Sequence, residues 1–216
     1  MRIVLLVLML MTLVSTDAWG QAPPRGPCEV PVAERTEELG CYLVVTQDLG
    51  VLPQGDFFWH LYTYPDLTTA EANKGPRSAI AQSFGRFWVY TIERSDWRPK
   101  IGKRVTVIGP LPHEVGKRYT ARYMEAVFAP NTSTRVHTHS GPEAWYVLTG
   151  AQCLETPDGI TVVKAGESSL VREGPPMMLS SVGSEKRRSV LLVLHDSSKP
   201  WSSLHTEWKP KGLCPK

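Results

Sequence analysis

The sequence predicts an all-β protein of the sandwich or barrel class. Short runs of apolar or alternating residues recur along the chain, and clusters of Gly, Pro and Asn separate them. The chain contains 17 Gly and 18 Pro among its 216 residues, and only one segment has a clear helical pattern. Many short strands at close spacing are typical of an antiparallel sandwich or a closed barrel.

Residues 1–20 have the pattern of a cleavable export signal. Arg2 precedes an apolar run over residues 3–14, and small residues, Ala18 and Gly20, end the segment. This run is too short to cross a bilayer, because a spanning helix needs about 20 apolar residues. The sequence therefore predicts a secreted or periplasmic protein without a stable membrane anchor.

The rest of the chain is long enough for one large β domain and too short for two full-sized ones. We expect a Pro-rich linker (21–31), an N-terminal β region (32–114), a barrel (115–200) and a C-terminal tail (201–216). Runs of apolar, β-branched and aromatic residues predict strands at 41–46, 57–64, 87–92, 105–108, 121–128, 144–148, 160–163, 168–171 and 189–195. A helix is expected at 66–73, capped by Thr68 or Thr69, and a second short one near 32–39.

A weak internal repeat relates the two halves of the chain. Gly and Pro landmarks recur 64 to 66 positions apart, as in Gly85 with Gly150. Regular hairpin spacing explains this pattern, and so does a degenerate duplication. In the second case the first copy has lost its ligands, because residues 75–85 contain no His or Glu.

The charge pattern argues against a nucleic-acid partner. The chain has 24 Lys and Arg against 21 Asp and Glu, and its formal net charge is only +3. Its basic residues are scattered apart from Lys186-Arg187-Arg188, which we interpret as a solvated turn. A nucleic-acid-binding protein is expected to have a basic stripe with interleaved aromatic residues.

The four cysteines are expected to form disulfides, because an even number in an exported chain favours pairing. We favour Cys28 with Cys214, which would tie together two Pro-rich tails, and therefore Cys41 with Cys153. The alternative is four unpaired, buried thiols.

A candidate metal site lies around residue 140. His137 and His139 are two positions apart, so their side chains point to the same face of a strand. The turn formed by residues 140–142 reverses the chain, and Glu143 can then face the two imidazoles. Two imidazoles and one carboxylate can bind Fe, Mn, Zn, Ni or Cu and leave coordination positions open for catalysis.

Residues 131–150 resemble the first sequence motif of the cupin superfamily, Gly-x5-His-x-His-x3,4-Glu-x6-Gly. His137, His139 and Glu143 take the positions of the family's metal ligands, and Gly150 ends the motif. Asn131 replaces the first Gly of the motif and tolerates the left-handed backbone that such a turn needs. The resemblance implies a cupin-type jelly-roll barrel that binds a divalent transition metal, with an N-terminal β extension or degenerate repeat.

The second cupin motif is only half present. Gly166 and Gly174 fit it, whereas Arg172 and Ser181 replace its Pro and Asn. Met177 stands where the family has a histidine as its fourth metal ligand. A thioether is a soft ligand that suits copper better than Mn or Fe, so Met177 is either a weak fourth ligand or an apolar wall of the pocket.

Strand alternation extends the predicted pocket. Trp145 and Val147 share the face of Glu143, which makes the interior mostly apolar and aromatic and suits a small, partly apolar molecule. Trp145 is equally compatible with a role in core packing alone. Four other histidines are expected to lie outside the site, facing solvent, although His195 is the best placed of them to compensate: His60, His113, His195 and His205.

Two main functions follow from these patterns. The first is an exported metal-binding cupin, with enzyme activity of the oxidoreductase, isomerase or lyase type on a small molecule. The second is a non-enzymatic cupin that binds a small ligand and whose metal site is eroded. A third hypothesis is an oligomerising protein, since barrels of this kind can form homodimers through exposed strands. Fold class alone does not choose among them.

Overall fold

The computed structural model describes residues 26–216. The predicted export signal and most of the predicted linker lie outside these residues. The described chain is nearly all β, which confirms the predicted fold class. No helix in this part of the chain is long and apolar enough to cross a membrane.

Antiparallel strands account for about half of the described residues. In chain order they are β1 (Gly40–Val51), β2 (Phe58–Tyr64), β3 (Ser78–Ser83), β4 (Arg86–Glu93), β5 (Lys103–Ile108), β6 (Arg118–Phe128), β7 (His137–His139), β8 (Glu143–Thr149), β9 (Ala151–Thr156), β10 (Gly159–Lys164), β11 (Ser168–Val171), β12 (Met178–Val182), β13 (Arg187–Asp196) and β14 (Ser202–Leu204). Each strand predicted from the sequence is present, whereas β3, β9, β12 and β14 were not predicted.

The two predicted helices are shorter than expected. The first is α1 (Leu67–Glu71), whose cap is Asp66 because the Asp66 carboxylate accepts a hydrogen bond from the Thr69 amide at 2.7 Å. The predicted threonine cap was therefore wrong. The segment near 32–39 contains only a 3-10 turn (Val32–Glu34), after which the chain leads into β1.

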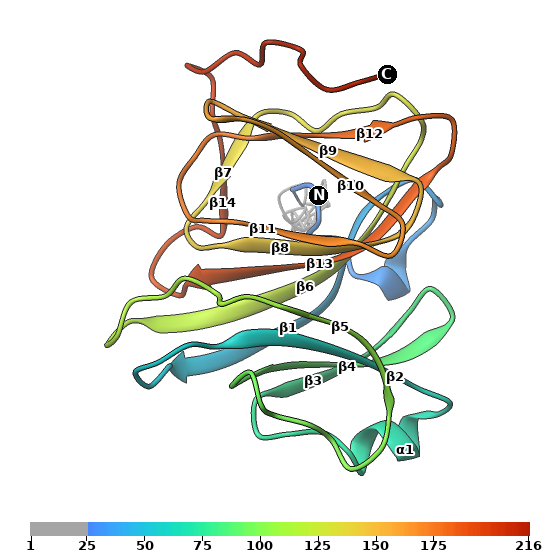
Figure 1. Cartoon of the computed structure of the whole chain (residues 1–216), viewed down its shortest axis with the longest axis vertical. Helices are drawn as coiled ribbons and strands as arrows, with labels where there is room; N and C mark the ends of the chain where they lie inside the picture. The colour runs from blue at the N-terminus through green and yellow to red at the C-terminus, as the bar shows by residue number, and fades with distance from the viewer. Residues whose placement is uncertain (1–25) are drawn as a thin grey trace, which may run out of the picture.

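The sheets are stacked in three layers (Figure 1). The middle layer is a five-stranded sheet in the order β1-β6-β13-β8-β11. Above it in Figure 1 lie the sheet β10-β9-β12 and the pair β14-β7, and below it lies the sheet β3-β4-β2-β5. The middle sheet therefore separates two interiors.

Alternation along the middle strands supplies side chains to both interiors. Trp145 and Val193 pack into the upper core between the middle sheet and β9-β12. Ala144 and Leu192, which are their neighbours in sequence, pack into the lower core with the buried aromatic side chains of β2 and β4. This two-sided burial explains why β8 and β13 contain long apolar runs.

The N-terminal part of the chain contributes to both layers. Strand β1 pairs with β6 along its whole length and completes the edge of the middle sheet, whereas β2 to β5 form the lower sheet. The predicted division into an N-terminal region, a barrel and a tail stays a prediction, as does the internal repeat.

All four cysteines are disulfide-bonded, but the predicted pairing was wrong. The structure joins Cys28 to Cys41 and Cys153 to Cys214. The N-terminal segment runs beside β1, where the Leu43 amide donates to the Val30 carbonyl at 2.8 Å. Cys28 is thereby placed next to Cys41 rather than near the C-terminus.

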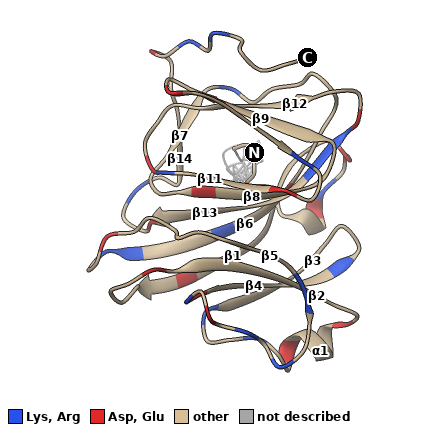
Figure 2. Cartoon of the chain, viewed as in Figure 1, with Lys and Arg blue, Asp and Glu red and all other residues tan. Residues whose placement is uncertain are grey.

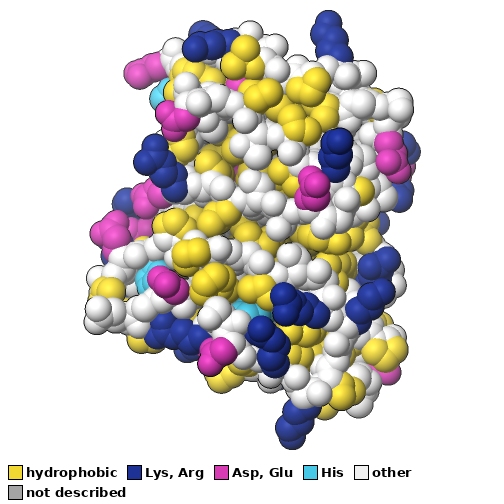
Figure 3. All heavy atoms as spheres, viewed as in Figure 1, with side chains coloured by type: hydrophobic (Ala, Val, Ile, Leu, Met, Phe, Trp, Pro, Cys, Tyr) yellow, Lys and Arg dark blue, Asp and Glu magenta, His cyan; other side chains and the backbone are white. Residues whose placement is uncertain are grey.

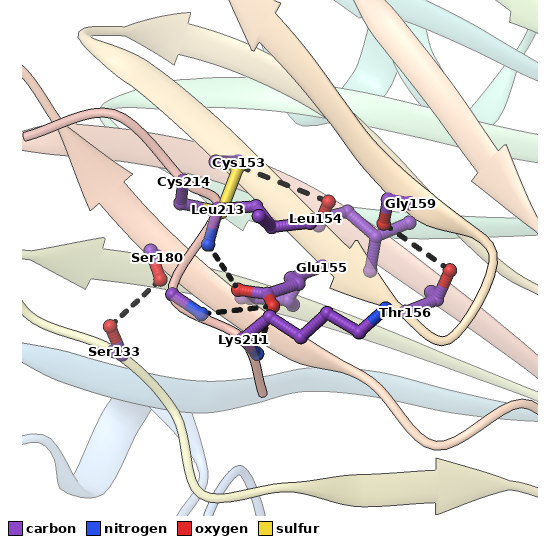
Figure 4. Close-up of a disulfide and its surroundings, with 12 residues drawn as sticks. Ser133, Cys153, Leu154, Glu155, Thr156, Gly159, Ser180, Lys211, Leu213 and Cys214 are labelled. Atoms are coloured by element: carbon purple, nitrogen blue, oxygen red, sulfur yellow. Dashed lines mark hydrogen bonds between the residues drawn. A yellow bond between two sulfur atoms is a disulfide. The ribbon is translucent and has the colours of Figure 1, made fainter. Parts of the chain in front are cut away.

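The C-terminal tail crosses the outer face of β9 (Figure 4). The buried Glu155 carboxylate accepts hydrogen bonds from the backbone amides of Lys211, Gly212 and Leu213. This clamp places Cys214 on Cys153. Each tail is thus fastened to the strand that it crosses, and the two tails are not joined to each other.

Charges of both signs are distributed over the surface. On the side shown in Figures 2 and 3, Lys and Arg occur among Asp, Glu and neutral side chains in both the upper and the lower half. The expected absence of a nucleic-acid partner stays a prediction.

Candidate metal centre

Strands β7 and β8 and the turn between them position the candidate ligands. His137 and His139 occupy alternate positions of β7, and Glu143 is the first residue of β8. Gly141 lets the connecting turn pack against β13, because a Cβ atom there would lie 1.8 Å from the Leu194 carbonyl oxygen. As a result, one ligand atom from each of the three side chains lies within 4.8 Å of the other two.

The hydrogen bonds of the two imidazoles fix their tautomers. Nδ1 of His137 lies 2.8 Å from the carbonyl oxygen of Arg135, and Nδ1 of His139 lies 2.9 Å from that of Trp201. Because a carbonyl oxygen only accepts, each Nδ1 is the protonated donor. In the neutral rings Nε2 then carries a free lone pair, and this arrangement orients metal-binding histidines in general.

The acceptor atoms that face one another are buried and unpaired. His139 and Glu143 are only 6% and 2% exposed. His139 Nε2 and Glu143 Oε2 lie 3.5 Å apart, and within the described residues neither atom has a hydrogen-bond partner. Unpaired polar atoms are costly in a buried site, so a divalent cation fits this donor set well.

Burial and mutual attraction shift the pKa values of the three groups in different directions. Burial lowers the pKa of His137, with the attraction of Glu143 acting against it. Burial also disfavours charge on His139 and Glu143, but their attraction outweighs it, so the pKa of His139 rises and that of Glu143 falls. Without a metal, the pair therefore favours a carboxylate beside an imidazolium.

The candidate ligands open onto a cavity of about 570 Å³ inside the barrel. Trp145 lines this cavity beside them, as predicted from strand alternation, and Val147 is buried in the same core. Met177 is fully buried in that core too, and its backbone pairs with His137 through hydrogen bonds of 3.1 and 2.9 Å. The structure thus brings Met177 beside a candidate ligand, whereas its role as a ligand stays a prediction.

The other histidines do not join the group. His113 and His205 are partly exposed. His60 and His195 were expected to face solvent, and this was wrong, since their side chains are 0% and 8% exposed. His60 lies in the lower half of the molecule, where its Nε2 meets the Arg94 carbonyl oxygen, and His195 Nδ1 meets the Asp196 carbonyl oxygen.

Arg187 and Gln152 are among the polar residues of the cavity that were missed at the sequence level. Arg187 is only 2% exposed and lines the cavity, so the interpretation of residues 186–188 as a solvated turn was wrong for it. Gln152 lines the cavity from β9, a strand that was not predicted. Arg187, Leu191 and Val193 occupy alternate positions of β13, so their side chains face the same side of the sheet. This alternation is the sequence signal that could have revealed the inward orientation of Arg187.

The antiparallel barrel carries the His-x-His and Glu side chains on its inner face at the spacing of the first cupin motif. The barrel has a cupin fold. The cupin resemblance noted in the sequence is therefore confirmed at the level of the fold.

Comparison with known proteins gives matches among solved structures alone. No family model matches the chain, and no curated protein matches its sequence. A cupin superfamily protein from Desulfitobacterium hafniense is 13% identical over 40% of this chain and 74% of its own, with a TM-score of 0.33. A cupin-like protein from Thermotoga maritima is 15% identical over 40% of this chain and 68% of its own, with a TM-score of 0.37.

The enzymes among the similar structures are matched over less of their length. An oxalate oxidase in complex with the substrate analogue glycolate is 20% identical over 40% of this chain, with a TM-score of 0.33. The match spans 45% of the oxalate oxidase chain and 44% of a DMSP lyase chain.

Proposed function

We propose that the cupin barrel binds one divalent transition metal through Nε2 of His137, Nε2 of His139 and the Glu143 carboxylate. The observation that carries this proposal is the set of hydrogen bonds around the two imidazoles. Both rings donate from Nδ1 to main-chain carbonyls and turn their lone pairs toward a buried carboxylate. The main-chain carbonyls thus orient the two rings so that Nε2 of each, once deprotonated, can bind the metal.

The proposed activity is that of a metal-dependent enzyme of the oxidoreductase, isomerase or lyase type. A bound Fe, Mn, Zn, Ni or Cu ion would supply Lewis acidity or a site for oxygen. The chain itself supplies a cavity of about 570 Å³, a size that suits a small molecule. Trp145 and Leu191 present apolar surface toward this space, which favours a partly apolar substrate.

A second candidate function is that of a non-enzymatic ligand-binding cupin with a weakened metal site. The observation that favours it is Met177, which is paired with His137 where the family has its fourth ligand. A thioether binds Mn or Fe weakly. In this case the same cavity would hold a small ligand without converting it.

We also propose that the protein is secreted or periplasmic. Two disulfides support this compartment, because such bonds persist mainly in oxidising environments. Export can be tested by fractionating cells that express the full chain and determining the N-terminal residue of the mature protein. Retention of Met1 in the purified native protein would contradict cleavage after residue 20.

Metal analysis of untagged protein tests the proposed centre. We expect about one equivalent of transition metal in the wild type and a large loss in His139→Ala and in Glu143→Gln. His205→Ala is the matched control, since His205 lies outside the group and should leave the metal content unchanged. Metal content well below one equivalent after metal supplementation, or content that neither substitution alters, would refute the proposal.

The state of the coordination sphere separates the two candidate functions. In Mn(II)-loaded protein, the relaxation of water protons reports exchangeable water on the ion. An enzyme needs such an open position, so we expect enhanced relaxation in the wild type and its suppression by a bound ligand. A Mn(II) centre without exchangeable water would favour the non-enzymatic function.

A further inference from the structure

The barrel contains further buried polar side chains besides the candidate ligands. We name four of them the polar end, which we define as Gln152, Ser181, Arg187 and Ser189. In the described structure, each of these four residues has at least one buried side-chain nitrogen or oxygen atom without a hydrogen-bond partner. Nothing in the metal proposal accounts for this group.

Arg187 is the central residue of the polar end. Its side chain is 2% exposed, and its guanidinium lies over the Phe128 ring, 4.3 Å from the ring centroid. Within residues 26–216, Nε of Arg187 is buried and has no hydrogen-bond partner. Burial lowers the pKa of Arg187 to about 9, a direction that the Glu143 charge opposes.

Gln152 belongs to the same end of the barrel. It pairs with Ser181 in the register of β9 and β12, so both side chains point to the same face. The turn before it places Gly150 against β13, where a Cβ on Gly150 would lie 3.1 Å from the Arg187 Cα. Both the amide oxygen and the amide nitrogen of Gln152 are buried without partners in the described chain.

A buried guanidinium whose Nε has no hydrogen-bond partner is unfavourable, and so is a buried amide without hydrogen bonds. A carboxylate would correct both defects at once. Its two oxygens match the paired donors of a guanidinium, and it can accept a further hydrogen bond from an amide. A point cation or a purely apolar ligand would leave Nε of Arg187 unpaired.

Arg187 and Gln152 of the polar end line the same cavity as the candidate ligands, and the charges of Arg187 and Glu143 act on each other. On β13, Val193 pairs with Glu143, whereas Arg187 lies six positions away, which corresponds to about 20 Å of strand. The two long side chains shorten this span. Apolar side chains also line this cavity, among them Leu179 and Leu191.

We propose that this cavity binds a carboxylic acid with an apolar middle, whose carboxylate pairs with Arg187 and Gln152. The other end of the molecule then reaches His137, His139 and Glu143. This part rests on the proposed metal function, whereas the binding of the carboxylate does not require a metal. The substrate or ligand class is therefore a small acid that carries a metal-binding group opposite its carboxylate.

Matched pairs of acids and amides test this proposal by calorimetric titration at neutral pH. The probes are benzoate, 3-phenylpropionate and 5-phenylpentanoate, each compared with its neutral amide. For at least one chain length we expect the wild type to bind the acid about tenfold or more tightly than the amide, as hydrogen bonds to a charged group imply. We expect this preference in metal-free protein as well.

Arg187→Gln tests the residue itself. It should weaken binding of the preferred acid by about tenfold or more and leave binding of the amide unchanged. Arg188→Gln is the matched control, because Arg188 is the adjacent residue but pairs with Glu38 at the surface. Thermal unfolding monitors folding, and we expect Arg187→Gln to be no less stable than wild type without ligand, since it removes a buried charge whose Nε has no hydrogen-bond partner.

Three outcomes would overturn the inference: equal binding of acid and amide by the wild type, full acid binding by folded Arg187→Gln, or no binding of any probe. If Arg187→Gln does not fold, the comparison of acid with amide in the wild type decides alone. Acid preference in a protein that binds no metal would overturn only the metal proposal. Metal binding without acid preference would overturn only the carboxylate site.

Discussion

The turn between β7 and β8 gives the sharpest stability prediction, and the perturbation is Gly141→Ala. The Cβ atom of alanine would lie 1.8 Å from the Leu194 carbonyl oxygen and 2.9 Å from the His195 Cα. These are backbone atoms of β13, which cannot rotate away as a side chain could. An ordinary contact begins near 3.4 Å, so the turn must move by about 1.6 Å.

Such a shift would break the hydrogen bonds that attach the turn to β13. The Leu194 amide donates to the Pro142 carbonyl and the Asp196 amide to the Ser140 carbonyl, each at 3.0 Å. Each lost bond costs about 1 kcal/mol, and leaving a partner buried and unpaired costs about 1 to 3 kcal/mol more. We therefore expect Gly141→Ala to lower the free energy of unfolding by about 3 to 5 kcal/mol.

Urea unfolding measures this loss, and metal titration measures its effect on the site. Because the turn joins His139 to Glu143, a variant that folds should also bind metal more weakly. Gly116→Ala is the control: it has a positive φ of 89° but no atom near its Cβ position, so it should lose only about 1 to 2 kcal/mol of backbone energy. A loss below about 1 kcal/mol in Gly141→Ala, with unchanged metal affinity, would refute the steric argument.

Three further predictions concern the disulfides, the buried pair and the fourth ligand position. Loop-closure entropy predicts that the Cys153–Cys214 bond, with a separation of 61 residues, stabilises the fold by about 4 kcal/mol. The Cys28–Cys41 bond, with a separation of 13 residues, is expected to contribute about 3 kcal/mol. Cys214→Ser should therefore lower the free energy of unfolding, measured in urea, by more than Cys28→Ser does. In metal-free protein Glu143 raises the pKa of His139 in the folded state. The attraction between the two groups therefore stabilises the fold fully at pH values below the ordinary histidine pKa of about 6.5. This stabilisation is lost as the pH rises through the raised pKa of His139 in the folded protein. The stability difference between wild type and Glu143→Gln should shrink over that rise in pH, and a difference that grows would contradict the coupling. Met177→His should bind Mn(II) or Fe(II) more tightly in calorimetry, and no gain would place residue 177 outside the coordination sphere.

Most strands were predictable because their sequences alternate or are uniformly apolar. Strands β8 and β13 contain long apolar runs, and each was expected near its observed position. Strands β3, β9 and β12 carry Ser, Gln and other polar residues on part of their length, so periodicity alone did not reveal them. Their strand conformation depends on pairing with neighbours that lie far away in the sequence.

The candidate metal ligands were predictable because they are local. His137, His139 and Glu143 lie within seven residues of one another, so one strand, one turn and the next strand suffice to bring them together. The disulfide partners were not local in this sense. Cys214 meets Cys153 only because the tail follows β9, and the interaction of Glu155 with backbone amides of the tail has no recognisable sequence motif.

The sequence by itself determined the all-β class, the cupin-type motif and the residues able to hold a metal, because these depend on spacings of a few residues. The tertiary structure alone decided that Arg187 lies inside the barrel, that Met177 pairs with His137 and that each tail is fastened to its own strand. These features depend on which distant strands become neighbours. Alternation along β13 indicates which face Arg187 shares with Leu191 and Val193, but only the packing of distant strands decides that this face is buried.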